Sequence, residues 1–204
     1  TLGDMYRYTF ATSSGYFSTV YSSYQGMIAR ANYILDGYKK VDMSNAVVYT
    51  PENIAKIKVA VGDAYFTRAY SIFGLSQYFC ADYEASTASA ANSGVSYRLD
   101  YAPSSSAATY PARATLEQTF KQITEDLDSA AKYITAEGEA SYGYFSQDAI
   151  KALRARVALA MDDYTNAAKY ATELIKDGKY TLAEDADELA DLWQNDGGNE
   201  TIMQ

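Results

Sequence analysis

The sequence predicts an all-α fold of stacked helical hairpins, interrupted by one long irregular loop at about residues 80–112. Residues 144–182 carry two short runs of apolar residues at helical spacing, joined by an acidic turn. Signals for helix starts precede further amphipathic runs, and no alternation of polar and apolar residues continues long enough to indicate a strand. Because one helical hairpin cannot bury its apolar face alone, we expect neighbouring hairpins to stack on each other.

The first two helices are predicted from an apolar stripe and from a start signal. A stripe of apolar residues at helical spacing predicts a helix at about 17–36, with Gly37 as its C-terminal stop. Thr50-Pro51 predicts the start of the second helix, because a hydroxyl can cap it and proline is tolerated at its first position. This helix is expected to end near Phe79.

The remaining helices have clear capping residues. Thr115 followed by Gln118 is a capping box, in which each side chain bonds the other residue's backbone amide. Ser146 is the expected cap of the fourth helix, and Gly178 the expected end of the fifth. A short sixth helix is predicted at about 186–193.

Composition limits the partners of this chain. It has 204 residues, a net charge of -9, no histidine and one cysteine, Cys80. An acidic surface repels nucleic acid and anionic lipid, and a single cysteine excludes an internal disulfide. No apolar run approaches the length of a membrane span. We expect residues 1–204 to form a single helical-repeat domain, excised from the N-terminal portion of a longer chain.

The acidic residues do not indicate catalysis or metal binding. Asp162-Asp163 and the run 184–188 lack the ligand spacing and central glycine of a calcium loop, so we interpret them as turns and helix starts. Glycoside hydrolysis needs two carboxylates held across one bond, and no pair is singled out here. The absence of histidine removes the commonest general base. We therefore predict a non-enzyme with no metal and no cofactor.

Four polar residues within or next to predicted helices are interpreted as structural. Asn32 and Arg68 lie within helices, where buried polar groups normally have hydrogen-bond partners. We expect them to satisfy neighbouring backbone groups, and we expect Asp126 to pair with Arg113 across a helix start.

Five strings, in order, resemble one known family. They are YQGMIARANYIL at 24–35, GDAYFTRAY at 62–70, RAT at 113–115 with ITEDLDSA at 123–130, the hairpin at 144–182, and NETI at 199–202. Together they resemble the SusD/RagB family of nutrient-binding outer-membrane lipoproteins of Bacteroidetes, in the region where that family has a tetratricopeptide-like scaffold. The string FCADY at 79–83 departs from the family's usual F-G-x-x-P.

The resemblance implies a non-catalytic function at the cell surface. A family member captures oligosaccharide and hands it to a TonB-dependent, SusC-like transporter in the outer membrane, where a lipid anchor, absent from this chain, would hold it. The alternative is a helical-repeat scaffold that binds a peptide or partner protein along its hairpins. An aromatic cleft in the loops would favour sugar, whereas an aromatic groove along the hairpins would favour peptide.

The candidate ligand residues are aromatic. The chain has 21 tyrosines, and a flat ring can stack on the apolar face of a sugar at low entropic cost. Anchoring of loops is the competing interpretation for each ring. The resemblance favours the segment before the first helix as the source of ligand contacts. The loop at 80–112 could instead face the partner transporter. The predicted ligand contacts are Tyr6, Tyr8, Tyr16, Phe17, Tyr21 and Tyr97.

Overall fold

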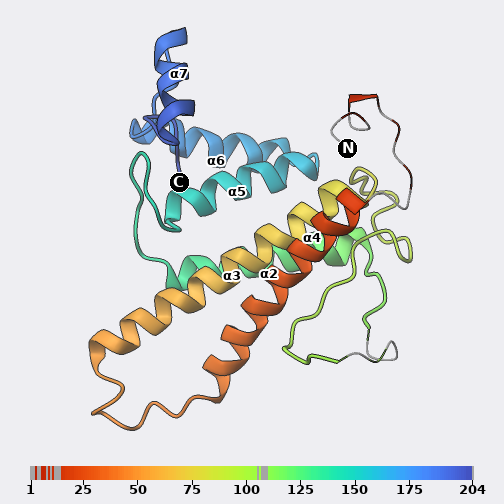
Figure 1. Ribbon diagram of the computed structural model, residues 1–204, viewed down its shortest axis with the longest axis vertical. Coiled ribbons are helices and arrows are strands. Elements are labelled where there is room, and N and C mark those ends of the chain that lie inside the picture. Colours follow the sequence, from red (N-terminus) through yellow and green to blue (C-terminus); the bar gives the residue numbers. More distant parts are fainter. Residues whose placement is uncertain are drawn as a thin grey trace.

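The computed structural model confirms the all-α prediction (Figure 1). It describes residues 3, 6, 7, 9, 11, 15–104, 106 and 110–203, and in these ranges it contains helices and turns but no strand. None of the described helices has the length and apolar character needed to cross a membrane. The main helices are α2 (Gly15–Lys40), α3 (Pro51–Phe79), α4 (Leu116–Tyr133), α5 (Gln147–Ala160), α6 (Tyr164–Asp177) and α7 (Ala186–Asn195).

Local capping explains most helix boundaries. The Thr50 hydroxyl accepts from the Asn53 amide at the start of α3, and both bonds of the predicted capping box at Thr115 are present in α4. The Ser146 hydroxyl accepts from the Ala149 amide at the start of α5. Gly178 ends α6 in the left-handed conformation at φ 65°, where glycine has no steric penalty. These four predictions are confirmed.

Two predictions about the helices were wrong. Helix α2 starts at Gly15 and continues through Gly37 to Lys40, because a glycine without a left-handed backbone is tolerated inside a helix at a modest cost. The second apolar run predicted within residues 144–182 includes Ile175 and was expected to face the core, but Ile175 is 76% exposed. Helix α6 is an outer helix that contacts α5, and Leu174 is its one buried residue.

The acidic turns act as helix caps. The Asp163 side chain accepts from the Asn166 amide at the start of α6. The Asp185 side chain accepts from the amides of Asp187 and Glu188 at the start of α7. These contacts confirm that the carboxylate clusters belong to helix starts. Helix α7 has no buried residue and projects from the end of the α5–α6 pair (Figure 1).

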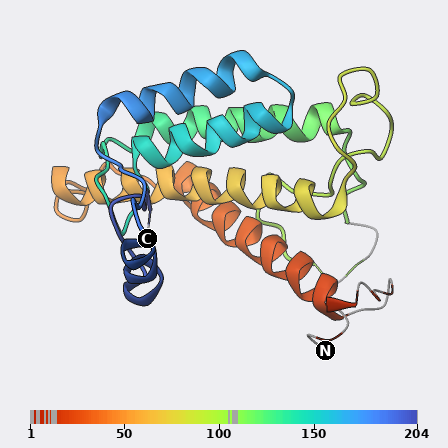
Figure 2. The same cartoon turned by 90° about the horizontal axis from the view of Figure 1, so that it is seen from above.

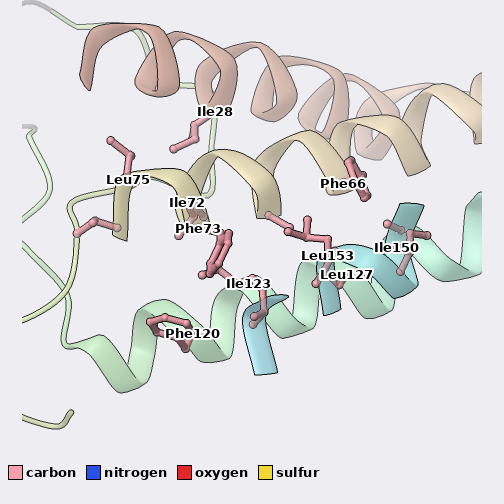
Figure 3. Close-up of a cluster of buried hydrophobic side chains, with 14 of the residues drawn as sticks. Ile28, Phe66, Ile72, Phe73, Leu75, Phe120, Ile123, Leu127, Ile150 and Leu153 are labelled. Atoms are coloured by element: carbon pink, nitrogen blue, oxygen red, sulfur yellow. The ribbon is translucent and has the colours of Figure 1, made fainter. Parts of the chain in front are cut away.

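One hydrophobic core joins the hairpins. Helix α3 lies between α2 on one side and α4 and α5 on the other (Figure 2). Figure 3 shows Ile28 of α2, Phe73 of α3, Phe120 of α4 and Leu153 of α5 pointing into the shared interior, and all four are buried. The helices therefore stack as the sequence predicts, because each one covers an apolar face of its neighbour.

Residues 88–95 of the long loop are held by contacts at the start of α4. The Gly94 amide donates to the Ala114 carbonyl, and the Glu117 amide donates to the Ala88 carbonyl at 2.9 Å. Gly94 lies so close to α4 that a Cβ built on it would overlap the Thr119 hydroxyl. This part of the loop is therefore irregular in conformation but fixed against the start of a helix.

Candidate functional site

A cleft of about 540 Å³ opens where the C-terminal half of α2 meets the start of α3 and the long loop. Tyr33 and Tyr38 come from α2, Tyr49 from the connection to α3, and Tyr101 from the long loop. The lining includes four tyrosines and the apolar residues Ile34 and Ile57. We call this feature the tyrosine cleft. Concave, largely apolar surfaces with a few polar groups are the usual form of ligand sites.

The rim of the tyrosine cleft presents aromatic rings to solvent. Tyr33 is 63% exposed and Tyr101 is 43% exposed, and their ring centroids lie 5.0 Å apart in an edge-to-face arrangement. Tyr38 is held from behind by an edge-to-face contact with Tyr133 at 6.1 Å. The exposed rings of Tyr33 and Tyr101 can therefore offer ring surface and hydroxyl groups to a ligand, while Tyr38 is fixed by its contact with Tyr133.

The segment that carries Tyr101 lies along α2. We call residues 96–101 the strap. Gln25 donates to the Ser96 carbonyl at 2.7 Å, and the Asn32 amide donates to the carbonyls of Arg98 at 2.8 Å and Asp100 at 3.2 Å. These two α2 side chains hold the strap through its backbone.

Asp36 completes the line of strap contacts. Its carboxylate accepts from the Tyr101 amide at 2.7 Å and from Lys39 Nζ at 3.1 Å. The Tyr101 amide, followed by Lys39, holds the pKa of the Asp36 carboxyl below its ordinary value of 3.8. Asp36 is therefore anionic at neutral pH.

A buried ion pair orients Asn32. Arg68 donates to both carboxylate oxygens of Asp126, at 2.8 and 2.6 Å, and to Asn32 Oδ1 at 2.8 Å. Since a guanidinium can only donate, Asn32 must direct its oxygen at Arg68 and its amide nitrogen at the strap. Both residues are structural, and the prediction that Asn32 bonds backbone groups is confirmed. Arg68 was expected to do the same, but it bonds the side chains of Asp126 and Asn32 instead.

The predicted pair of Asp126 and Arg113 was wrong. Arg113 instead donates to the carbonyls of Gly94 at 2.7 Å and Phe79 at 3.1 Å. Arg113 lies near Thr115 in sequence, so its side chain reaches the loop packed against the helix start rather than the middle of α4.

The predicted ligand residues occupy a different region from the tyrosine cleft. Tyr16 and Phe17 lie on the first turn of α2, and Tyr21 on its second turn packs edge-on against Phe79 at 5.3 Å. Tyr6 is described and exposed, whereas Tyr8 lies outside the described residues.

Tyr97 belongs to the strap but points to α4. Its hydroxyl donates to the Gln118 carbonyl at 3.3 Å, and burial raises the pKa of Tyr97. The structure thus places Tyr16, Phe17 and Tyr21 on the first two turns of α2 and directs the Tyr97 hydroxyl to α4. Their role in ligand binding stays a prediction.

Sequence reasoning did not select Tyr33, Tyr38 or Tyr49. A usable signal existed for Tyr33, because it stands off the apolar stripe of the predicted helix, and in the structure it is exposed. An aromatic residue on the solvent side of an amphipathic helix is a candidate contact residue. The sequence offers no comparable signal for Tyr49.

In the part of the chain that the structure describes, no group of three or more Cys, Asp and Glu side chains is placed to hold a metal ion. The chemistry that the tyrosine cleft offers is ring stacking and hydrogen bonding, which suits reversible binding.

The family follows from comparison with known proteins. A SusD-like family model, described as "Starch-binding associating with outer membrane", matches residues 3–159. The chain belongs to the SusD-like family. No curated protein sequence matches it.

Solved SusD-like structures share this fold. A SusD superfamily protein from Bacteroides thetaiotaomicron is 26% identical with a TM-score of 0.71, over 92% of this chain and 37% of that one. The surface glycan-binding protein A from Bacteroides fluxus is 20% identical with a TM-score of 0.63, over 90% and 35%. A protein described as a laminarin-binding SusD-like protein is 20% identical with a TM-score of 0.66, over 91% and 36%. The chain therefore spans little more than a third of each of these relatives.

Proposed function

We propose that this protein captures a glycan at the bacterial cell surface, without transforming it, and hands it to a TonB-dependent, SusC-like transporter in the outer membrane. The observation that carries the proposal is the family match over residues 3–159, whose description names starch binding and association with the outer membrane. The names of the laminarin-binding and surface glycan-binding relatives support the same class of ligand.

The proposal treats residues 1–204 as one helical-repeat domain of a longer protein. The structural relatives are more than twice as long as this chain, since it covers 35–37% of those compared above. The lipid anchor and the surface that meets the transporter are part of the proposal for that longer protein.

The tyrosine cleft is the proposed contact site for sugar. Tyr33 and Tyr101 would stack on the apolar face of a pyranose ring, since a rigid ring supplies contact area at low entropic cost. The hydroxyls of Tyr38 and Tyr49, which also line the cleft, would bond the sugar's own hydroxyls. In this arrangement the affinity for sugar depends on stacking against the rings of Tyr33 and Tyr101, and no catalytic group is needed.

Native affinity electrophoresis in gels containing starch or laminarin tests this function. We expect at least one of these neutral polysaccharides to retard the protein, and the Tyr33→Ala variant to lose about tenfold in affinity, as for a central aromatic contact. Tyr164→Ala is the matched control, because Tyr164 on α6 is also 63% exposed and lies outside the tyrosine cleft.

Four results bear on the proposal. Equal loss in both tyrosine variants would argue against the cleft. Loss in a Tyr16→Ala, Phe17→Ala variant with Tyr33→Ala unaffected would move the site to the start of α2. Release of shortened oligosaccharides by the purified protein would contradict the non-catalytic function. For the longer protein, co-purification with the transporter is expected, and its absence would count against the transfer step.

The alternative function, a scaffold for a peptide or partner protein, draws support from the apolar character of the same cleft, where Ile34 and Ile57 accompany the tyrosines. It differs in its expected result. A scaffold would show no retardation by any polysaccharide. A neutral amphipathic peptide would instead quench the fluorescence of Tyr33 and Tyr101 or shift their NMR signals.

A further inference from the structure

The strap is fixed to one face of α2 by three polar side chains. Gln25, Asn32 and Asp36 are spaced by seven and four residues, so they lie on the same face of the helix. In the same order they bond to the backbone at Ser96, at Arg98 and Asp100, and at Tyr101. The α2 contacts thus run along the whole strap.

From this geometry we infer that Gln25, Asn32 and Asp36 are positioning residues of the ligand site, which hold the strap so that Tyr101 forms one wall of the tyrosine cleft opposite Tyr33. The inference rests on the proposed function for its ligand. Its structural part concerns the strap alone and can be tested without a ligand.

The strap also has contacts within itself and with α4. The Arg98 side chain pairs with Asp100 within the strap, so this contact stiffens the strap but does not attach it to a helix. At the other end, the Val95 amide donates to the Thr119 hydroxyl of α4 at 3.3 Å. Between that anchor and Tyr101, the Tyr97 hydroxyl bonds the Gln118 carbonyl of α4. The bonds from Gln25, Asn32 and Asp36 hold the backbone of the strap against α2.

The orientation of Asn32 depends on a residue of α3. Arg68 Nη1 donates to Asn32 Oδ1, and Arg68 is itself fixed by both oxygens of Asp126. The ion pair therefore keeps the Asn32 amide nitrogen directed at the two strap carbonyls. Through these bonds, the packing of α2, α3 and α4 determines the position of a cleft residue, although Arg68 and Asp126 are not part of the cleft lining.

A strap held in advance raises affinity, because a protein whose binding conformation is only partly populated binds its ligand more weakly by that fraction. Loss of one of the hydrogen bonds between α2 and the strap would let the strap leave α2 for part of the time. Tyr101 would then leave Tyr33, and the ring pair at 5.0 Å would no longer form one rim.

The Asn32→Asp substitution tests this directly. The new carboxylate keeps an oxygen for Arg68 but turns its second oxygen toward the carbonyls of Arg98 and Asp100, where two acceptors repel each other. We expect the Tyr101 amide, the strap amide that donates to α2, to exchange with deuterium at least tenfold faster, while exchange within α3 and α4 changes far less. Affinity for maltoheptaose or laminarihexaose, whichever the wild-type protein binds, is expected to fall about tenfold.

Two further variants keep the test decisive. Gln25→Ala removes one neutral hydrogen bond from a partly buried position, so the variant should fold. Its backbone amides next to Ser96 should exchange faster, and it should bind the oligosaccharide about fivefold more weakly. Asn166→Asp makes the same chemical change on α6 and should alter neither the strap's exchange nor sugar affinity.

The outcomes separate the two proposals. Unchanged strap exchange in both Asn32→Asp and Gln25→Ala would overturn the inference, and so would faster exchange with unchanged sugar affinity. If the wild-type protein binds neither oligosaccharide, the proposed function fails for these sugars, while faster exchange confined to the strap would still support its positioning by α2. Equally faster amide exchange throughout the protein would mean that Asn32 is needed for the fold rather than for the strap.

Discussion

Replacing Arg68 by leucine measures how much the buried ion pair contributes to the packing of α2, α3 and α4. The Arg68 and Asp126 side chains are 7% and 2% exposed, and the pair is bidentate. In Arg68→Leu the Asp126 carboxylate keeps the bond from Gln122 but loses its charge partner. Asn32 Oδ1 loses its donor as well.

The expected loss follows from these two defects. Breaking a buried ion pair by removing one partner costs about 3–5 kcal/mol, because the other charge stays buried without compensation. For a domain of this size we expect the free energy of unfolding to fall by about 4 kcal/mol and the melting temperature by about 8–16 °C. Urea unfolding followed by circular dichroism gives the free energy, provided that the slope against urea is unchanged.

Two comparisons make this test specific. Lys56→Ala removes one partner of an exposed pair with Glu52, whose side chains are 71% and 76% exposed, and should change stability by no more than about 1 kcal/mol. The double variant Arg68→Leu, Asp126→Leu removes both charges and leaves mainly the Asn32 oxygen unpaired, so we expect a loss of about 1–3 kcal/mol. A single variant within about 1 kcal/mol of wild type, or a double variant worse than the single, would refute the reasoning.

The remaining predictions concern close packing and charge. Gly94→Ala should cost about 1–3 kcal/mol, because its Cβ would overlap α4, whereas Gly26→Ala, with open space around its Cβ, should be neutral or stabilising by up to about 1 kcal/mol in the same urea assay. Asp148→Ala removes the acceptor of Lys151, Lys179 and Tyr180, so we expect a loss of about 2 kcal/mol and, by NMR titration, a Tyr180 pKa that falls from about 12. The pKa of Asp36 is depressed by its bonds, so its contribution to the stability of the strap contact is present above pH 3.8 and is lost as the pH falls through the lower folded-state value. Deuterium exchange of the strap, corrected for intrinsic rates, should therefore stay constant from neutral pH to about pH 5 and rise only below 3.8. A rise already at pH 5 would contradict this assignment.

Local chemistry made the helix boundaries predictable. Thr50, Thr115, Ser146 and Gly178 act on backbone groups within three or four residues, so their effect can be inferred from short strings of sequence. Gly37 shows the limit, because a glycine ends a helix only where the chain turns left-handed, and here the helix continues to Lys40.

The candidate site was not predictable by the same means. Asn32 and Arg98 are separated by 66 residues, and helical periodicity tells which face of α2 is apolar but not which loop lies on its polar face. The family motifs mark Asn32 and Arg68 in the right strings, yet the pairing of Arg68 with Asp126 across 58 residues appears only in the folded chain. The tyrosine cleft depends on these distant pairings, because they bring Tyr101 beside Tyr33.

A crystal structure of this protein soaked with the oligosaccharide that binds best tests the central claim most directly. We predict a sugar ring stacked on Tyr33 or Tyr101 within the tyrosine cleft, with the strap in the position that α2 gives it here. A sugar bound instead beside Tyr16 and Phe17 at the start of α2, with the tyrosine cleft free of ligand, would contradict the account.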